Sequence, residues 1–278
     1  MSIVPVAAEA IFSIGTFSVT NTLINAFLAL GIFLVTAFFL RSAKKDVPGR
    51  FQNFVEMVIE FLLKFFDQVT GDREKSKKFF PMVGSLFLFI LVCNWMGLLP
   101  GVGSIGLWKG LAGEKEFVPL FRSANSDLNL TLAMAVLSVI GSHIVGVVTI
   151  GFFAHANKFI QLGGIWKALK SMKPINILVS LIEFVVGLIE MVSEIAKMAS
   201  LSLRLFGNVF AGEVLITVIG SLAAFLIPLP FMALEILVGI VQATVFAMLT
   251  LVYLTVMTMK PHGESHEKPA HGEHAIAH

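Results

Sequence analysis

The sequence predicts an all-α polytopic membrane protein with five membrane-crossing helices and one interfacial amphipathic helix. Its 278 residues are 56% apolar and only 14% charged, with a mean hydropathy of +0.88, whereas soluble domains carry about 25% charged residues. Uncharged runs exceed the roughly 18 residues that mark a transmembrane helix. They span 10–40, 79–108, 128–157, 214–234 and 236–259. This composition excludes a soluble enzyme, a disulfide-rich secreted scaffold and a nucleic-acid binder.

The basic residues predict how the chain is oriented, because Lys and Arg collect in cytoplasmic loops. With five spans and the N-terminus outside, fifteen of the twenty Lys and Arg residues fall inside and three fall outside, in 109–127. The other two, Lys197 and Arg204, lie within a membrane segment. We therefore expect a multi-pass protein of a bacterial inner membrane, with a periplasmic N-terminus and a cytoplasmic C-terminus.

The expected elements follow the runs in order and form one membrane domain over residues 1–259. After the first span, four charged residues recur at helical spacing on one face, and the rest of that helix is apolar, which is typical of a helix lying in the interface. It is either a connector packed against lipid or a docking surface for a partner. The charged residues are Glu56, Glu60, Lys64 and Asp67. The expected helices are 18–41, 50–69 (interfacial), 79–100, 128–154, 174–222 and 230–259.

Residues 174–221 pose a problem of length. One helix would be about 72 Å long at 1.5 Å per residue, whereas the hydrocarbon core is about 30 Å thick. Two spans with a turn are the alternative, but no Gly or Pro lies between Met191 and Phe206 to make one. The first clear breaker is Pro228, followed by Pro230. We expect one long, steeply tilted helix and a hairpin near Pro228, so that the last two helices form a tilted pair.

The remaining features carry little chemistry. The tail, 260–278, holds five of the seven histidines among Gly, Glu, Lys and Pro, a composition typical of disorder. Cys93 is the only cysteine and lies inside an apolar run, so we expect its side chain to pack among apolar neighbours. We expect no specific metal site and no cofactor.

Ionisable residues mark the long helix that begins at Pro174. An Arg, Lys or Asp at mid-bilayer costs about 2.5–3.5 kcal/mol on insertion scales, so such groups must face protein, each other or water. A stripe on one face recurs every seven residues, close to two full turns: Glu183, Glu190, Lys197 and Arg204. Ser200, Gly207 and Ala211 flank Arg204 with small side chains, which let a neighbouring helix approach closely.

Acids lie on both sides of Arg204 along the chain. Glu213, nine residues further on, points to the opposite face and toward the outer end. Folding back at Pro228 brings Glu235 near the level of Glu213, with Gln242 deeper. A cation entering from one side would meet acids and then a fixed positive charge, so it could not pass straight through. The other interpretation is that Arg204 pairs with a Glu and locks two helices together.

Four motifs occur in order along the chain and resemble those of subunit a of the F-type ATP synthase membrane sector, over roughly residues 20–259. They are Asn94–Pro100 (NWMGLLP), Ser123–Thr131 (SANSDLNLT), Ser200–Glu213 (SLSLRLFGNVFAGE) and Gln242–Tyr253 (QATVFAMLTLVY). The resemblance implies that the last two helices curve around a rotating ring of c subunits. It also implies peripheral-stalk b subunits and the rest of the ATP synthase complex as partners.

The resemblance implies roles for named residues on the outer side and at the centre. Arg204 matches the arginine that faces the ion-carrying carboxylate of the ring. Glu213 and Glu235 match positions that line the outer half-channel, and Gln242 matches the polar partner beside the arginine. Some relatives carry His at the Glu235 position, so here a Glu–Glu pair could share one proton. Asn208, within the motif, adds a polar contact.

On the inner side, Glu190 matches an acidic position of the inner half-channel, although Glu183 and Glu194 remain alternatives. The implied function is that of a stator, whose two offset half-channels pass H⁺ to and from the ring carboxylates and couple proton flow to ATP synthesis or hydrolysis. The choice between H⁺ and Na⁺ depends on ligands in the ring. The chain would be a membrane component of the complex, not an enzyme on its own.

Two other classes of protein compete with this interpretation. A stand-alone secondary transporter or ion channel often has internal repeats, and we find none relating 20–100 to 130–260. An intramembrane enzyme would need a catalytic motif, and the sequence has no HExxH or GxSxG. His143 and His155, twelve residues apart, could only loosely share a helix face and fit core or interfacial positions.

Overall fold

The computed structural model describes residues 5–42, 49–99, 101–109, 116–159, 174–222 and 226–259. Four helices in these ranges are long and apolar enough to cross a membrane, which confirms a polytopic, predominantly helical membrane protein. They are α1 (Asn21–Ser42), α3 (Arg73–Gly97), α4 (Leu128–Ile150) and α8 (Pro228–Thr258). The His-rich tail, 260–278, lies outside the described residues.

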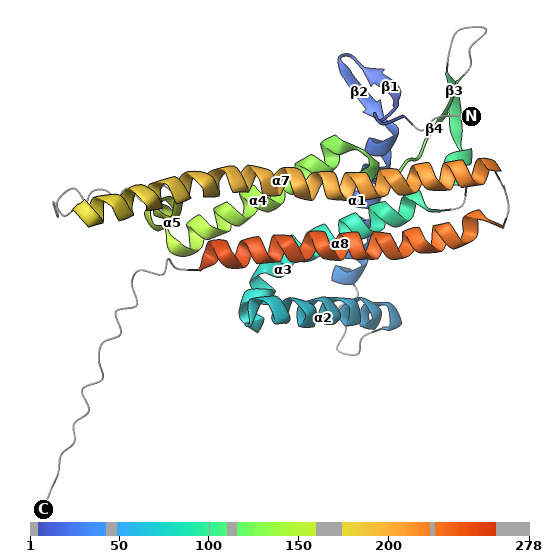
Figure 1. Ribbon diagram of the computed structural model, residues 1–278. Helices are drawn as coiled ribbons and strands as arrows, with labels where there is room; N and C mark the ends of the chain where they lie inside the picture. The colour runs from blue at the N-terminus through green and yellow to red at the C-terminus, as the bar shows by residue number, and fades with distance from the viewer. Residues whose placement is uncertain are drawn as a thin grey trace, which may run out of the picture.

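Two short antiparallel hairpins lie at one side of the helices (Figure 1) and were not foreseen from the sequence. The first pairs β1 (Ala10–Ile14) with β2 (Phe17–Thr20), and Gly15 turns between them at φ 64°, a conformation that favours glycine. The second pairs β3 (Gly106–Lys109) with β4 (Glu116–Pro119). The first expected helix therefore begins at Asn21, after the hairpin.

The start of α1 is tied to the segment that leads into α4. The Asn25 amide donates to the carbonyl of Arg122 at 2.8 Å, and the Thr22 hydroxyl donates to Asp127 at 3.1 Å. The Asp127 carboxylate also caps α4 by accepting from the backbone N–H of Asn129. These contacts hold the loop before α4 in one position, and that loop contributes to the site described below.

The amphipathic helix α2 (Arg50–Thr70) packs Leu62, Leu63 and Phe66 inward against α3 and α8. It ends at Gly71 in the left-handed conformation. Arg73 then bridges back to Glu60 at 2.6 Å and Asp67 at 2.8 Å. Hydrogen bonding from Ser76, reinforced by Arg73, holds the pKa of Asp67 below its usual range, so this corner keeps its ion pair at neutral pH.

The core lies where α3, α4, α8 and the long helix α7 (Pro174–Leu222) meet. Its buried side chains include Ile90, Met134, Leu205, Phe246 and Leu251. This arrangement follows from the amino-acid pattern, because each helix supplies its apolar or small side chains to the shared interior. The site is therefore built on packed helices.

In the structure α7 is one helix of 49 residues. It runs beside α8 in the opposite direction, and α1 crosses both steeply in the view of Figure 1. Residues 223–225, between α7 and α8, lie outside the described residues. A helix of this length fits a membrane only when it is strongly tilted.

Two helix ends differ from the expected bounds for local reasons. The expected helix 128–154 ends at Ile150, because Gly151 adopts φ 88° and α5 (Phe152–Phe159) turns back against α4 and α7. The expected helix 79–100 begins earlier, at Arg73, where the Asp72 side chain accepts from the backbone N–H of Glu74. The turn at Gly151 sets where His155 of α5 lies relative to His143 of α4.

Candidate functional site

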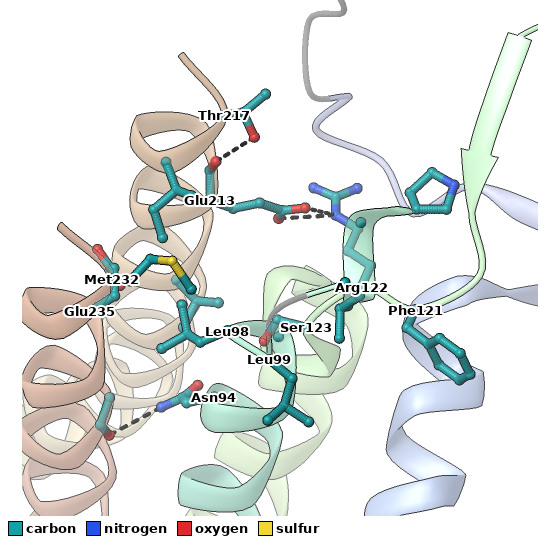
Figure 2. Close-up of a pocket in the computed structure, with 18 of the residues that line it drawn as sticks. Asn94, Leu98, Leu99, Phe121, Arg122, Ser123, Glu213, Thr217, Met232 and Glu235 are labelled. Carbon is teal, nitrogen blue, oxygen red and sulfur yellow. Dashed lines mark hydrogen bonds and ion pairs between the residues drawn. The ribbon is translucent and has the colours of Figure 1, made fainter. Parts of the chain in front are cut away.

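A cavity of about 720 Å³ lies between α7, α8, the end of α3 and the loop before α4 (Figure 2). Three of the predicted site residues line it: Glu213 from α7, and Glu235 and Gln242 from α8. These residues come from two helices that run in opposite directions, so their meeting depends on the pairing of α7 with α8. The cavity is lined by both polar and apolar groups.

A buried arginine, Arg122, pairs with Glu213. From the sequence it was expected only to be one of the three basic residues of the outer segment 109–127. Arg122 Nε donates to both carboxylate oxygens, at 2.9 and 3.0 Å (Figure 2). Arg122 Nη1 donates to the carbonyl of Ala7 at 3.3 Å. The Arg122 side chain is 3% exposed and that of Glu213 is 27% exposed. The Arg122 guanidinium also lies over the ring of Phe210. The pair fixes one acid on the cavity wall beside a permanent cation.

Glu235 is half-buried and lies against the backbone of Gly212, one residue before Glu213. Its carboxyl group occupies the space that a Cβ atom at Gly212 would fill, so only glycine leaves this side chain in place. Among the described residues, Glu235 has no hydrogen bond or ion pair within reach. The two acids therefore differ: Glu213 is paired with Arg122, and Glu235 is available to the cavity.

Two asparagine side chains, Asn94 and Asn125, form a hydrogen-bonded chain at one side of the cavity. Asn125 donates to the side-chain oxygen of Asn94 at 2.7 Å. Asn94 in turn donates to the carbonyl of Gly239 at 3.1 Å (Figure 2). A Cβ at Gly239 would lie 3.2 Å from the Cβ of Asn94, so the glycine permits the close approach of α8 to α3. Residues of the Asn94–Pro100 and Ser123–Thr131 motifs thus position α8 beside the cavity.

Arg204 lies on the exposed surface of α7, apart from the cavity. Its nearest polar contact is the Ser200 hydroxyl, at 3.5 Å from Nη2, and it makes no ion pair with an acid in the part of the chain that is described. Gly207 has open space beside it, and Ala211 is exposed. The structure does not support a lock between Arg204 and a Glu of this chain.

The remaining predicted residues lie along α7. Asn208 and Glu190 are half-buried and do not line the cavity. Glu183 is also half-buried, and neither it nor Glu190 forms an ion pair within the described ranges. Glu194 differs, because it is buried and accepts from Lys197 at 2.6 Å. The structure thus brings Glu213, Glu235 and Gln242 together and leaves Arg204, Asn208 and Glu190 outside the cavity.

These features define a class of protein. An acidic cavity lies on one side of an exposed arginine on a long apolar helix, and a buried acid lies on the other side. Ionisable groups within membrane segments face protein, each other or water, and they characteristically mark the paths of ions or protons. The fold and the site are those of an ion-translocating membrane subunit.

The comparisons with known proteins give the family. The profile described as "ATP synthase A chain" matches residues 22–255. Relatives include subunit a of the ATP synthase of Desulfotalea psychrophila, 37% identical over 83% of this chain and 79% of the relative, and that of Geobacter sulfurreducens, 34% identical over 80% of each. The sodium-ion-specific subunit a of Propionigenium modestum is 32% identical over 90% of this chain and 78% of its own length.

The chain belongs to the ATP synthase A chain family. It is a membrane component of the ATP synthase complex with the role of stator in its proton channel, and it is not catalytic on its own. The prediction made from the four motifs is confirmed. A stand-alone transporter or channel is not favoured.

Proposed function

We propose that this chain carries out the stator role through two half-channels that open on opposite sides of Arg204 and meet a ring of c subunits. The outer half-channel is the cavity at Glu213, Glu235 and Gln242. The inner half-channel runs along α7 on the Pro174 side of Arg204, past Glu190. The observation that carries the proposal is the exposure of Arg204 on α7 without an acid of the described chain as its partner.

The proposed arrangement in the membrane has five spans: α7 is added to the four apolar helices α1, α3, α4 and α8. In this arrangement α7 and α8 form a tilted hairpin. Residues 1–259 form one membrane domain in a bacterial inner membrane, with a periplasmic N-terminus and a cytoplasmic C-terminus. The steep crossing of α1 over α7 and α8 supports the tilt (Figure 1), and the distribution of Lys and Arg supports the orientation. The peripheral-stalk b subunits are the second proposed partner in the membrane.

In the proposed cycle a proton enters past Glu235 and Glu213 and neutralises a carboxylate of the ring. The neutral site can rotate into lipid, whereas a charged one would cost several kcal/mol. At the inner half-channel the site loses its proton. Arg204 stabilises the ionised ring carboxylate and repels protons that would cross directly between the half-channels, with Gln242 and Asn208 as polar neighbours. Each charge that falls through 100 mV yields about 2.3 kcal/mol.

Disulfide cross-linking tests the proposed contact with the ring. Ala211 is exposed and lies seven residues after Arg204, on the same face of α7. We expect Ala211→Cys to cross-link to a cysteine introduced beside the ring carboxylate. Ile195→Cys is the matched control, because Ile195 is also exposed but lies nine residues before Arg204, on the opposite face. Equal cross-linking of the two variants, or none by Ala211→Cys, would refute the proposed contact.

Gly212→Ala tests the outer half-channel. The new methyl group overlaps the Glu235 carboxyl group, which must move, while the packed backbone need not. We expect normal assembly, with ATP-driven proton pumping reduced about tenfold or more, because displacing a reacting group by about 1 Å can cost that much. Gly220→Ala on the same helix has open space and serves as the control. Pumping by Gly212→Ala at the control's rate would count against a role for Glu235.

A further inference from the structure

A second group of ionisable side chains lies on the other side of Arg204 from the cavity. Four elements contribute to it, and we call it the histidine cluster: His143 of α4, His155 of α5, Glu194 and Lys197 of α7, and Tyr253 of α8. Glu194 precedes Arg204 by ten residues, about 15 Å along the helix, whereas Glu213 follows it by nine. The cluster therefore occupies the part of α7 assigned above to the inner half-channel.

Three members of the cluster form a continuous row. His143 Nε2 lies 3.6 Å from Glu194 Oε2, an ion pair when the imidazole is protonated, and His143 Nδ1 lies 3.1 Å from His155 Nε2. The two imidazole rings meet edge to face. A neutral imidazole has one donor and one acceptor nitrogen, so it can take up a proton at one nitrogen and release one from the other. The row has the chemistry of a proton relay.

The three residues of the row differ in their exposure and in the charged groups beside them. The Glu194 side chain is 9% exposed, that of His143 is 27% exposed, and His155 as a residue is 6% exposed. Lys197 Nζ donates to Glu194 Oε1 at 2.6 Å and lies 5.4 Å from the centre of the Tyr253 ring. The lysine balances the charge of the buried carboxylate. The Glu194–Lys197 pair lies within α7, so the contact that joins Glu194 to α4 is the one with His143.

The fold makes room for the second imidazole. A Cβ at Gly146 would lie 2.9 Å from His155 Cε1 and 2.9 Å from the carbonyl oxygen of Met257. The absence of a side chain at Gly146 thus lets the His155 ring fit between α4 and the end of α8. Gly151 turns the chain so that α5 brings His155 back to His143. Two glycines are needed to build the row.

We propose that Glu194, His143 and His155 relay the proton that leaves the ring carboxyl group on the inner side, a proposal that rests on the function proposed above. The proton first forms an O–H bond at Glu194, which breaks as an N–H bond forms at His143 Nε2. The N–H bond at His143 Nδ1 then breaks as one forms at His155 Nε2, and the N–H bond at His155 Nδ1 breaks as an O–H bond forms on a water molecule of the inner half-channel. One proton enters, one leaves, and no electrons are transferred.

Proton conduction through the intact membrane sector in vesicles, after removal of the peripheral ATPase, tests the relay. His143→Gln keeps a hydrogen-bonding side chain but cannot carry the proton. We expect it to lower conduction about tenfold or more, since positioned proton-transfer groups contribute at least that much. Glu56→Gln, an exposed acid on α2, is the matched control.

Glu194→Gln is expected to lower conduction to the same extent. If this variant assembles poorly because Lys197 loses its partner, Glu194→Gln/Lys197→Met removes both charges and should assemble, with conduction still low. Wild-type conduction in His143→Gln, or in the double variant, would overturn the relay. Either result leaves the proposed ring contact intact, because that contact is tested separately by the cross-link through Ala211→Cys.

Discussion

Arg204→Ala is expected to abolish proton-driven ATP synthesis while the complex still assembles. The side chain is exposed on α7 and pairs with no acid in the described ranges, so its removal leaves no buried charge behind. It does remove the charge that separates the two proposed half-channels. A barrier of several kcal/mol is lost, and since about 1.4 kcal/mol is worth a factor of ten, coupled synthesis should fall at least about a hundredfold.

ATP synthesis in energised vesicles and the amount of this subunit in the purified complex measure the two parts of that prediction. Ser200→Ala is the matched control, because Ser200 lies one turn before Arg204 on the same face and makes its nearest polar contact. The control should synthesise ATP normally. Near-normal coupled synthesis by Arg204→Ala would rule out the role assigned to the arginine.

Arg122→Gln is expected to have the largest effect on stability. It leaves Glu213 on the cavity wall without its cation, and removing one partner of a buried pair typically costs about 3–5 kcal/mol. The double variant Arg122→Gln/Glu213→Gln removes both charges and should restore part of the loss. Assembly, measured as subunit recovered in the purified complex and its thermal denaturation, should therefore be better in the double variant than in Arg122→Gln.

The double variant still lacks the Glu213 carboxylate, so we expect ATP-driven acidification of vesicles to stay slow even where assembly recovers. Comparing assembly with acidification separates the two roles of the pair. Arg122 positions Glu213, and the Glu213 carboxylate takes part in proton transfer. Poorer assembly of the double variant than of Arg122→Gln would contradict the pairing. Acidification at the wild-type rate by the assembled double variant would remove Glu213 from the proposed pathway.

The membrane class and the family could be predicted from the sequence because both depend on local patterns. Long uncharged runs specify helices in lipid, and the Ser200–Glu213 motif is continuous in the chain. The first hairpin could not be predicted in this way. Residues 10–20 lie inside an uncharged run, and composition alone does not separate a short apolar strand from the start of a helix.

The parts of the site that sequence reasoning missed depend on contacts between distant segments. Arg122 and Glu213 are 91 residues apart, and the only signal was a cation immediately before the Ser123–Thr131 motif. His143 and His155 were compared as residues of one helix, whereas Gly151 ends that helix and returns His155 to His143. A positive φ at one glycine decides this geometry.

In the proposed function, Arg204 serves another chain and not its own. A structure of the complete membrane sector, with the ring present, tests this directly. We predict a ring helix alongside α7, with its carboxylate facing the Arg204 guanidinium, and no acid of this chain within an ion-pair distance of about 4 Å. An Arg204 paired with a glutamate of its own chain, with lipid in place of the ring helix, would contradict this prediction.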